Sequence, residues 1–264
     1  MTNRNLALVT GASSGIGLEL ARQFATHDFD VVVTAEDAEL TTAAIELRDT
    51  GATVHEVRTD LRTSDGVEHL WREVSALGRQ LDAAALNAGV GRGGAFLDIE
   101  LADELEIIDL NITSTVHLAK LVLRDMAARN EGRVLITSSI ASTMPGSFQA
   151  VYNASKSFTQ SFGLALRNEL KDTNVTVTLL MPGPTDTEFF ERADMLDTKV
   201  GASESKDDPE DVARDGFEAL MAGKERVVSH SLSTKLQGRS SRFLPDSAKA
   251  ELHRRQAEPG TAKK

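Results

Sequence analysis

The sequence contains no cysteine, and this absence excludes disulfide bonds, thiolate chemistry and cysteine-based zinc sites. It fits a reducing compartment, so we expect a cytoplasmic protein, and we predict no metal site. An excess of basic residues is also lacking, because 29 Lys and Arg stand against 40 Asp and Glu, for a formal net charge of -11. This charge repels phosphate backbones, so we predict no nucleic-acid partner.

Long hydrophobic runs are missing as well. The first apolar run covers only residues 6–9, which is far too short for a signal core or a spanning helix. We therefore expect neither an export signal nor an integral membrane segment. The chain has instead 41% hydrophobic and 26% charged residues over 264 positions, a composition typical of a globular protein with a sizeable core.

Short apolar runs rich in β-branched residues alternate with longer segments whose apolar residues recur at helical spacing. The predicted strands are residues 6–10, 31–34, 53–57, 82–86, 134–137, 175–181 and 226–229. The predicted helices are residues 16–25, 40–47, 67–77, 101–128 and 154–170. This alternation predicts a single-domain α/β fold with a doubly wound parallel β-sheet and helices on both faces. Functional groups then belong at the carboxyl ends of the strands.

We expect one domain over residues 1–246, followed by a short C-terminal helix and a flexible tail at residues 247–264. Residues 188–208 are polar and acidic without a strong period, which indicates a mobile lid over a substrate. Residues 232–244 are amphipathic and suit either a subunit contact or a cover for the core. A basic cluster indicates a solvated helix face, with membrane-surface binding as the alternative; it comprises Lys249, His253, Arg254 and Arg255.

A glycine-rich turn follows the first predicted strand and opens the first helix, the position that a phosphate-binding turn requires. Gly11 allows the tight turn, Gly15 lets backbone N–H groups approach a pyrophosphate, and Gly17 lets helix and strand pack closely. The spacing Gly-x-x-x-Gly-x-Gly differs from the usual Gly-x-Gly-x-x-Gly of dinucleotide sites. A connection that serves only the backbone is the alternative.

Tyr152 is the only tyrosine of the chain, and Lys156 follows one helical turn later on the same face. A phenol titrates near ~10, and it becomes a useful acid or base at neutral pH when a nearby cation such as Lys156 stabilises the phenolate. Such a tyrosine exchanges a proton with a carbonyl or alcohol oxygen during hydride transfer. A half-buried tyrosine beside a solvated lysine is the alternative.

Two further polar residues fit this chemistry. Ser139 comes just after the fifth predicted strand, where its hydroxyl either bonds a carbonyl oxygen or satisfies only the turn backbone. Asn111 lies inside the long helix predicted at residues 101–128. Its amide either faces water or holds a water molecule that relays protons from Lys156.

In their order along the chain, these residues resemble the short-chain dehydrogenase/reductase family over residues 5–187. The turn from Thr10-Gly11 to Gly17 is similar to the family's Thr-Gly-x-x-x-Gly-x-Gly, Asn87-Ala88-Gly89 to its Asn-Ala-Gly, and Pro182-Gly183 to its Pro-Gly. Tyr152 and Lys156 match its Tyr-x-x-x-Lys, and with Ser139 and Asn111 they complete an Asn-Ser-Tyr-Lys tetrad. The resemblance implies a Rossmann-type, NAD(P)-binding oxidoreductase.

The resemblance also implies roles for single residues. Tyr152 acts as general acid/base, and Lys156 tunes it and holds the nicotinamide ribose. Ser139 orients the substrate oxygen, and Asn111 supports a proton-relay water. The implied cofactor site comprises Gly11, Ser13, Ser14, Gly15, Ile16, Gly17, Glu36, Asp60, Leu61, Asn87, Ala88, Gly89, Tyr152, Lys156, Pro182, Gly183, Thr185 and Thr187.

The end of the second strand separates NAD from NADP, because a carboxylate there accepts from the ribose 2′-OH and repels a 2′-phosphate. Here Ala35 takes the place of the family's usual aspartate, and Glu36 takes the next place, where NADP-preferring members often carry arginine. We therefore favour NAD(H). NADP(H) stays open if Glu36 turns into solvent and either Arg48 or Arg62 reaches the phosphate.

The sequence thus predicts an NAD(P)-dependent oxidoreductase that interconverts a secondary alcohol and a ketone or aldehyde. The predicted substrate pocket suits a small, partly hydrophobic molecule and comprises Ser139, Val90, Met144, Phe148 and Phe189. A non-catalytic dinucleotide-binding regulator or redox sensor on the same fold is the alternative. An epimerase or dehydratase that uses its nicotinamide transiently is a third possibility. The resemblance also implies a homodimer or homotetramer.

Overall fold

The computed structural model of the chain describes residues 4–228 and 245–262. Within these residues, seven strands form one sheet of order β3-β2-β1-β4-β5-β6-β7, and every neighbouring pair is parallel. The strands are β1 (Asn5–Thr10), β2 (Phe29–Ala35), β3 (Val54–Arg58), β4 (Ala83–Leu86), β5 (Gly132–Thr137), β6 (Val175–Met181) and β7 (Arg226–Val228). The order reverses between β1 and β4, so the predicted doubly wound, Rossmann-type sheet is confirmed.

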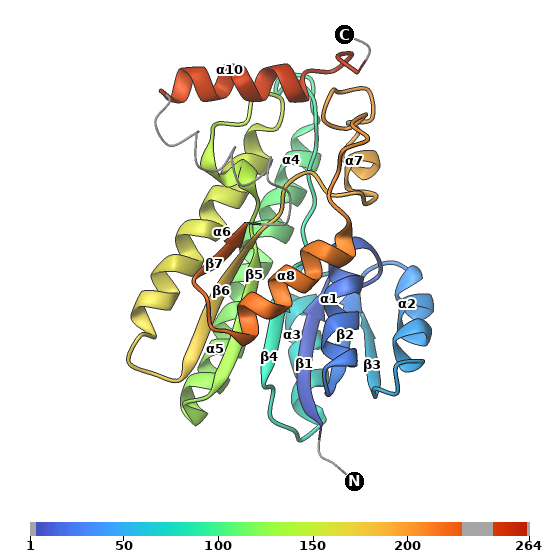
Figure 1. Cartoon of the computed structure of the whole chain (residues 1–264), viewed down its shortest axis with the longest axis vertical. Helices are drawn as coiled ribbons and strands as arrows, with labels where there is room; N and C mark the ends of the chain where they lie inside the picture. Colours follow the sequence, from blue (N-terminus) through green and yellow to red (C-terminus); the bar gives the residue numbers. More distant parts are fainter. Residues whose placement is uncertain (1–3, 229–244, 263–264) are drawn as a thin grey trace.

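Helices cover both faces of the sheet (Figure 1). One layer packs α1 (Gly15–Thr26), α2 (Glu39–Arg48) and α8 (Pro209–Met221) on the sheet. The opposite layer packs α3 (Ser64–Ala76), α5 (Ser114–Arg129) and α6 (Ala150–Glu169). Shorter elements lie at the carboxyl edge: α4 (Leu101–Ile108), the 3-10 turn η2 (Ile140–Thr143) and α7 (Phe189–Arg192).

The central strands are largely apolar because both of their faces are covered, whereas the edge strand β3 exposes Glu56 and Arg58. In β1, Ala7 and Val9 enter the core under α1 and α2, whereas Leu6 and Leu8 enter the core under α3 and α5. Side chains of a strand alternate between its two faces, so one continuous apolar run supplies both cores.

The structure differs from the predicted helices in two places. α8 was absent from the prediction, although Asp208 caps it by accepting from the Glu210 N–H at 2.8 Å and Pro209 occupies its first turn. The long helix predicted at residues 101–128 is divided into α4 and α5 by the π-helical turn η1 (Asp109–Thr113). Such turns widen the backbone spiral locally and are frequent at functional sites.

The C-terminal helix α10 (Asp246–Ala257) lies across the carboxyl edge of the sheet, close to α7 (Figure 1). The Val200 N–H donates to the Gln256 carbonyl at 3.0 Å, and Ala257 is buried in a small apolar cluster with Phe190 and Met195. The end of the chain therefore packs on the segment that follows β6. The amphipathic stretch predicted at 232–244 lies outside the described residues, as does the last residue of the strand predicted at 226–229.

Candidate active site

A cavity of about 1010 Å³ opens at the carboxyl ends of the strands. It is large enough for a dinucleotide together with a small substrate, because single ligand pockets are commonly ~300–1,000 Å³. Every predicted cofactor residue borders it, from the glycine turn to Thr185 and Thr187. Among the predicted catalytic residues, Ser139, Tyr152 and Lys156 border it, whereas Asn111 lies behind its wall.

The glycine turn is closely fitted to the strand that precedes it. Gly11 and Gly15 have positive φ angles of 66° and 53°, which side-chain-bearing residues rarely adopt. A Cβ atom on Gly17 would overlap the carbonyl oxygen of Gly11, and a Cβ on Gly15 would lie 2.9 Å from Cγ2 of Thr187. The turn therefore presents bare backbone to the cavity at the start of α1.

The first turn of α1 suits an anion. It carries no acidic residue, and its N-terminal N–H groups supply the partial positive charge of the helix dipole. The side chain of Ser13 donates to Oδ2 of Asp37 at 2.9 Å, so it fixes the turn to the segment after β2. Bare glycine backbone and a helix N-terminus together form a cradle that fits the pyrophosphate of a dinucleotide.

Asn87 ties three strand ends together at the floor of the cavity. Its side-chain Nδ2 donates to the Thr10 carbonyl at 3.2 Å, and its Oδ1 accepts from the Thr137 hydroxyl at 3.0 Å. The Thr10 hydroxyl in turn accepts from the backbone N–H of Asn87 at 2.9 Å. The amide thus holds β1, β4 and β5 in register beside the glycine turn.

Lys156 is buried on α6, and Tyr152, one helical turn earlier, is partly buried and borders the cavity. The Lys156 Nζ lies 5.8 Å from the centre of the Tyr152 ring and donates to the Thr137 carbonyl at 3.1 Å. Ser139 lies at the start of η2, and its hydroxyl accepts from the Ala141 N–H at 3.1 Å. Helix α6 and the end of β5 therefore bring the serine, tyrosine and lysine to one end of the cavity.

Burial shifts the pKa values of both Tyr152 and Lys156. It raises the pKa of Tyr152 to about 12, although a hydrogen bond with Ser139 opposes the shift. Burial also lowers the pKa of Lys156 to about 8. The sequence predicts that Lys156 lowers the pKa of the phenol, but desolvation of Tyr152 outweighs any such effect in this structure. At neutral pH the phenol keeps its proton and is poised to donate it.

Asn111 occupies the π-helical turn and is only 1% exposed. Its amide accepts from the Val90 N–H at 2.9 Å, and it donates to the Val90 carbonyl and the Ser155 hydroxyl, each at 2.9 Å. The side chain therefore does not face water, one of the two possibilities that the sequence left open. It fixes the segment after β4 against α6.

The substrate end of the cavity departs from the prediction at Phe148. Val90, Met144 and Phe189 border the cavity, and the Phe189 ring lies 5.2 Å from the Tyr152 ring. Phe148 does not border it, because its ring packs on the apolar cluster of Phe190 and Ala257. The structure therefore does not place Phe148 among the residues that line this cavity.

Helix α10 supplies cavity residues that the sequence did not indicate: Leu252, His253, Gln256 and Ala257. His253 belongs to the basic cluster that was predicted to face solvent, but it is partly buried and contacts the Ser147 carbonyl at 2.9 Å. Gln149, just before α6, also lines the cavity. No local pattern marks these residues, because only the return of the chain over the sheet edge brings them to the site.

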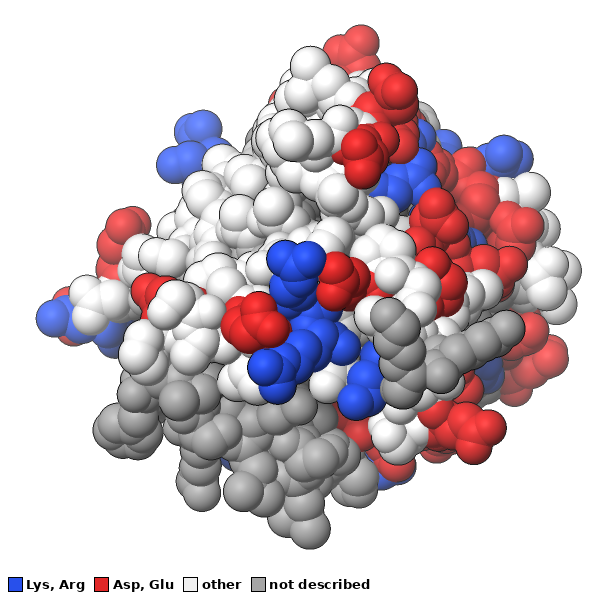
Figure 2. Space-filling model, turned by 90° about the horizontal axis from the view of Figure 1, so that it is seen from above, with Lys and Arg blue, Asp and Glu red and all other residues white. Residues whose placement is uncertain are grey.

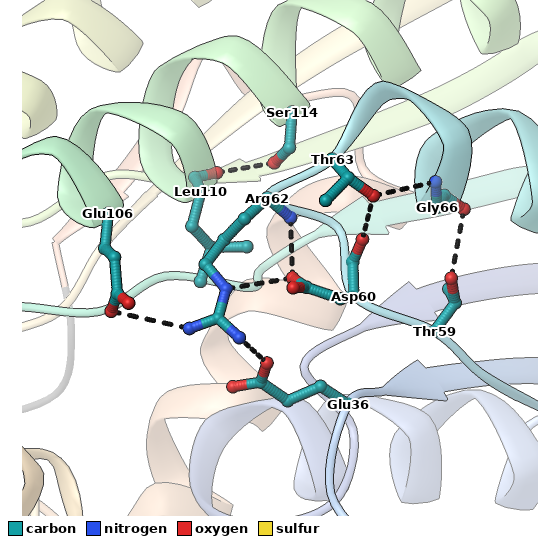
Figure 3. A network of polar contacts seen from close by, with 9 residues as sticks. All are labelled: Glu36, Thr59, Asp60, Arg62, Thr63, Gly66, Glu106, Leu110 and Ser114. Carbon is teal, nitrogen blue, oxygen red and sulfur yellow. Dashed lines mark hydrogen bonds and ion pairs between the residues drawn. The ribbon is translucent and has the colours of Figure 1, made fainter. Parts of the chain in front are cut away.

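Arg62 is the centre of a charged network at the other end of the cavity (Figure 3). Its guanidinium forms ion pairs with Glu36 from the end of β2, with Asp60 at 2.9 Å and with Glu106 of α4 at 3.4 Å. Burial alone would raise the pKa of Asp60, but hydrogen bonds from Arg62 hold it below its ordinary value. Arg48, the other arginine considered from the sequence, bonds the Val54 carbonyl instead.

The face above the sheet edge carries intermixed charges (Figure 2). A small group of Lys and Arg lies among acidic side chains, and acidic residues line one margin of this view. The described residues on this face form no continuous basic stripe of the sort that tracks a phosphate backbone. Among the described residues, no helix combines the length and apolar character needed to cross a membrane.

Comparison with known proteins agrees with this geometry. The model of the short chain dehydrogenase family matches residues 5–196. Retinol dehydrogenase 8 of Bos taurus is 35% identical over 190 residues, which cover 69% of this chain and 59% of that protein. The chain thus spans less than two thirds of that relative. It belongs to the short-chain dehydrogenase/reductase family, as the sequence predicts, with the family's NAD(P)-binding Rossmann-type fold.

Solved structures share the fold. A short chain dehydrogenase/reductase from Burkholderia phymatum in complex with NAD superimposes with a TM-score of 0.83, at 24% identity and over 97% of each chain. A short-chain dehydrogenase from Sphingobium yanoikuyae in complex with NADPH gives a TM-score of 0.79 at 23% identity, over 90% of this chain and 93% of that one. The fold of the whole described chain is therefore that of short-chain dehydrogenases.

Proposed function

We propose that the protein is an NAD(P)-dependent oxidoreductase that interconverts a secondary alcohol and a ketone or aldehyde. One observation carries the proposal: a buried Ser139 and Lys156 and a partly buried Tyr152 meet at one end of a cavity whose other end is a glycine turn at a helix N-terminus. A bound nicotinamide dinucleotide would supply the hydride, and the residues of the chain supply orientation and the proton.

Each residue has a distinct task in this reaction. The Ser139 hydroxyl orients the oxygen of the substrate, and the protonated Tyr152 donates to that oxygen as hydride arrives at the carbon. Lys156 provides positive charge beside the ring as the phenolate forms. Asn111 fixes the wall behind Val90 through its side-chain amide, and its backbone is the part that would hold a proton-relay water.

The name of a relative supports the reaction class. Retinol dehydrogenase 8 is named for the oxidation of an alcohol, and it matches this chain over the region that holds the tyrosine and lysine. A panel of ketones and aldehydes with NADH or NADPH tests the proposal directly. We expect loss of nicotinamide absorbance in step with alcohol formation. An epimerase or dehydratase would change its substrate without net loss of absorbance, and a non-catalytic regulator would bind cofactor without any turnover.

Reduction should depend on pH through Lys156. The lysine is charged below its pKa of about 8, and the phenol of Tyr152 stays protonated up to about 12. We therefore expect kcat/KM for carbonyl reduction to be level below about pH 8 and to fall above it. Lys156→Arg should remove this fall, because a guanidinium keeps its charge throughout. A wild-type profile that stays level through pH 8 and above would contradict the role of Lys156.

We favour NAD(H) over NADP(H) on the charges at the adenosine end of the cavity. Glu36, Asp37 and Asp60 border it with carboxylates, and Arg62 is already engaged by three acidic partners. A 2′-phosphate placed there would meet more negative than positive charge. The ribose 2′-OH, in contrast, can donate a hydrogen bond to Glu36.

We also propose a homodimer or homotetramer. Helix α4 exposes Leu101, Leu105 and Ile108 at helical spacing, with 67%, 46% and 36% of their surfaces accessible. Leu97, just before this helix, is 92% exposed, and α6 beside it exposes Phe158. Together these side chains form an apolar face that a second copy could cover.

Leu105→Glu should disrupt such a subunit contact. We expect the sedimentation coefficient to shift from that of an oligomer to that of a monomer, because a buried carboxylate would oppose association. The matched control is Ile45→Glu on α2, a comparably exposed apolar residue, at 56%, away from the α4 face. Identical sedimentation of all three proteins would exclude the α4 face as the contact.

The remaining predictions concern organisation. We propose that residues 188–208 act as a lid, since Thr187 packs on Gly15 and Glu188 accepts from the Ser14 hydroxyl at 3.4 Å. The segment thus touches the glycine turn from above. The boundary of the catalytic domain at residue 246 and a cytoplasmic location stay predictions.

A further inference from the structure

Two polar side chains that line the cavity, Gln149 and His253, have unused hydrogen-bonding capacity. Gln149 is only 7% exposed and lines the cavity one helical turn before Tyr152. Among the described residues its side-chain amide has no hydrogen-bond partner. The amide atoms are not among the fully buried unpartnered atoms of the described residues, so they face the open cavity, where a polar group of a ligand can bond them.

His253 has a defined donor and a defined acceptor. Its Nδ1 lies 2.9 Å from the Ser147 carbonyl, which can only accept, so Nδ1 carries the hydrogen. Burial lowers the pKa of His253, although the hydrogen bond to Ser147 acts in the opposite direction. Because its pKa is lowered, the ring is neutral at neutral pH. Nε2 is then a lone-pair acceptor, and no described residue donates to it.

One loop, residues 147–149, carries Gln149 and anchors His253 of α10. Ser147, which anchors His253, lies two residues before Gln149, and the Ser147 hydroxyl donates to the Ala250 carbonyl of α10 at 3.1 Å. Between them Phe148 has a positive φ of 65°, and the Gly94 N–H donates to its carbonyl at 3.0 Å. A side-chain-bearing residue in this strained conformation is typical of ligand-binding segments. At this bend the chain turns Phe148 toward the proposed lid and Gln149 toward the cavity.

We infer that Gln149 and His253 are specificity-determining residues that bind a hydroxyl group of the substrate away from the carbon that reacts. A hydroxyl can donate to Nε2 of His253 and accept from the amide of Gln149. A carboxylate or sulfonate cannot donate to Nε2, and a methyl group can do neither. The apolar neighbours Met144 and Leu252 would contact the carbon chain between the two oxygens. This inference rests on the proposed carbonyl reduction.

The test uses the full chain and linear methyl ketones that end in a hydroxyl, a methyl or a carboxylate, each at several chain lengths. At the best length, we expect the wild type to prefer the hydroxyl over the methyl ketone in kcat/KM. Gln149→Leu and His253→Leu should each lower this preference about tenfold, the effect of leaving one polar partner unpaired. The matched control is Arg255→Leu, which changes an exposed α10 residue outside the cavity and should keep the preference.

A second readout separates this inference from the proposed reaction. In protein labelled with ¹⁵N-histidine, the hydroxyl ketone should shift the Nε2 resonance of His253, whereas the methyl ketone should leave it in place. Reduction of all ketones with unaltered preference in both variants would overturn the inference alone. If no ketone is reduced but the Nε2 resonance shifts, the hydroxyl site stands and the proposed reaction fails. Neither reduction nor a shift would overturn both.

Discussion

Tyr152→Phe is expected to lower kcat for carbonyl reduction by at least about 100-fold, the scale of general acid catalysis. The substitution removes a single buried hydroxyl and keeps the ring against Phe189. Burial holds the pKa of this hydroxyl at about 12, so the proton that reaches the substrate oxygen comes from an intact phenol at neutral pH. No other tyrosine in the chain can replace it.

The loss of kcat in Tyr152→Phe must be distinguished from a loss caused by damage to the fold. Thr159→Val is a matched control, because it also removes a buried hydroxyl from α6, one that donates to the Lys156 carbonyl at 2.9 Å. We expect Thr159→Val to stay near wild-type turnover and Tyr152→Phe to bind cofactor with nearly wild-type affinity. Single-turnover absorbance measures the rate of reduction, and titration with the cofactor measures its affinity. Wild-type turnover in Tyr152→Phe would remove the tyrosine from the mechanism.

Glu36→Gln is expected to raise the affinity of the protein for NADPH by at least about tenfold and to lower its affinity for NADH. The variant removes a carboxylate from the adenosine end and frees one side of Arg62, so a 2′-phosphate meets less repulsion and gains a cation. Unlike charges at contact distance interact by several kcal/mol near a protein surface, so the change in affinity is measurable by calorimetry.

Glu106→Gln is the matched control for this change. Glu106 pairs with the same Arg62 at 3.4 Å but does not border the cavity. If repulsion by Glu36 sets the preference, Glu106→Gln leaves the ratio of the two affinities near wild type. An equal shift in both variants would mean that the availability of Arg62, rather than the charge of Glu36, decides between the cofactors.

The alternation of strands and helices predicts this fold well, because the central strands are covered on both faces and are largely apolar. The glycine turn, Tyr152 and Lys156 could be placed from sequence for a similar reason. Their spacing is fixed within one local element, a turn or a helix face. The π-helical turn at Asn111 could not be predicted from the sequence. The side chain of Asn111 is held by Val90 and Ser155, which belong to two other segments of the chain.

What the sequence missed depends on contacts between distant segments. Phe148 looked like a pocket residue because it is apolar and near Tyr152, but its ring packs on the apolar cluster of Phe190 and Ala257. His253 looked like part of a solvated basic face, and only the docking of α10 on Ser147 brings it to the cavity. The network of Arg62 similarly joins three elements whose order along the chain gives no sign of their meeting.

The central claim is that the cavity between the glycine turn and Tyr152 holds a nicotinamide dinucleotide, with the charges around Glu36 favouring the form without a 2′-phosphate. Titration of the wild-type protein with NADH and with NADPH, followed by nicotinamide fluorescence, tests it without any knowledge of the substrate. We predict saturable binding of both with a clear preference for NADH. Tighter binding of NADPH would contradict the proposal that Glu36 disfavours a 2′-phosphate. Binding of neither cofactor would contradict the central claim as a whole.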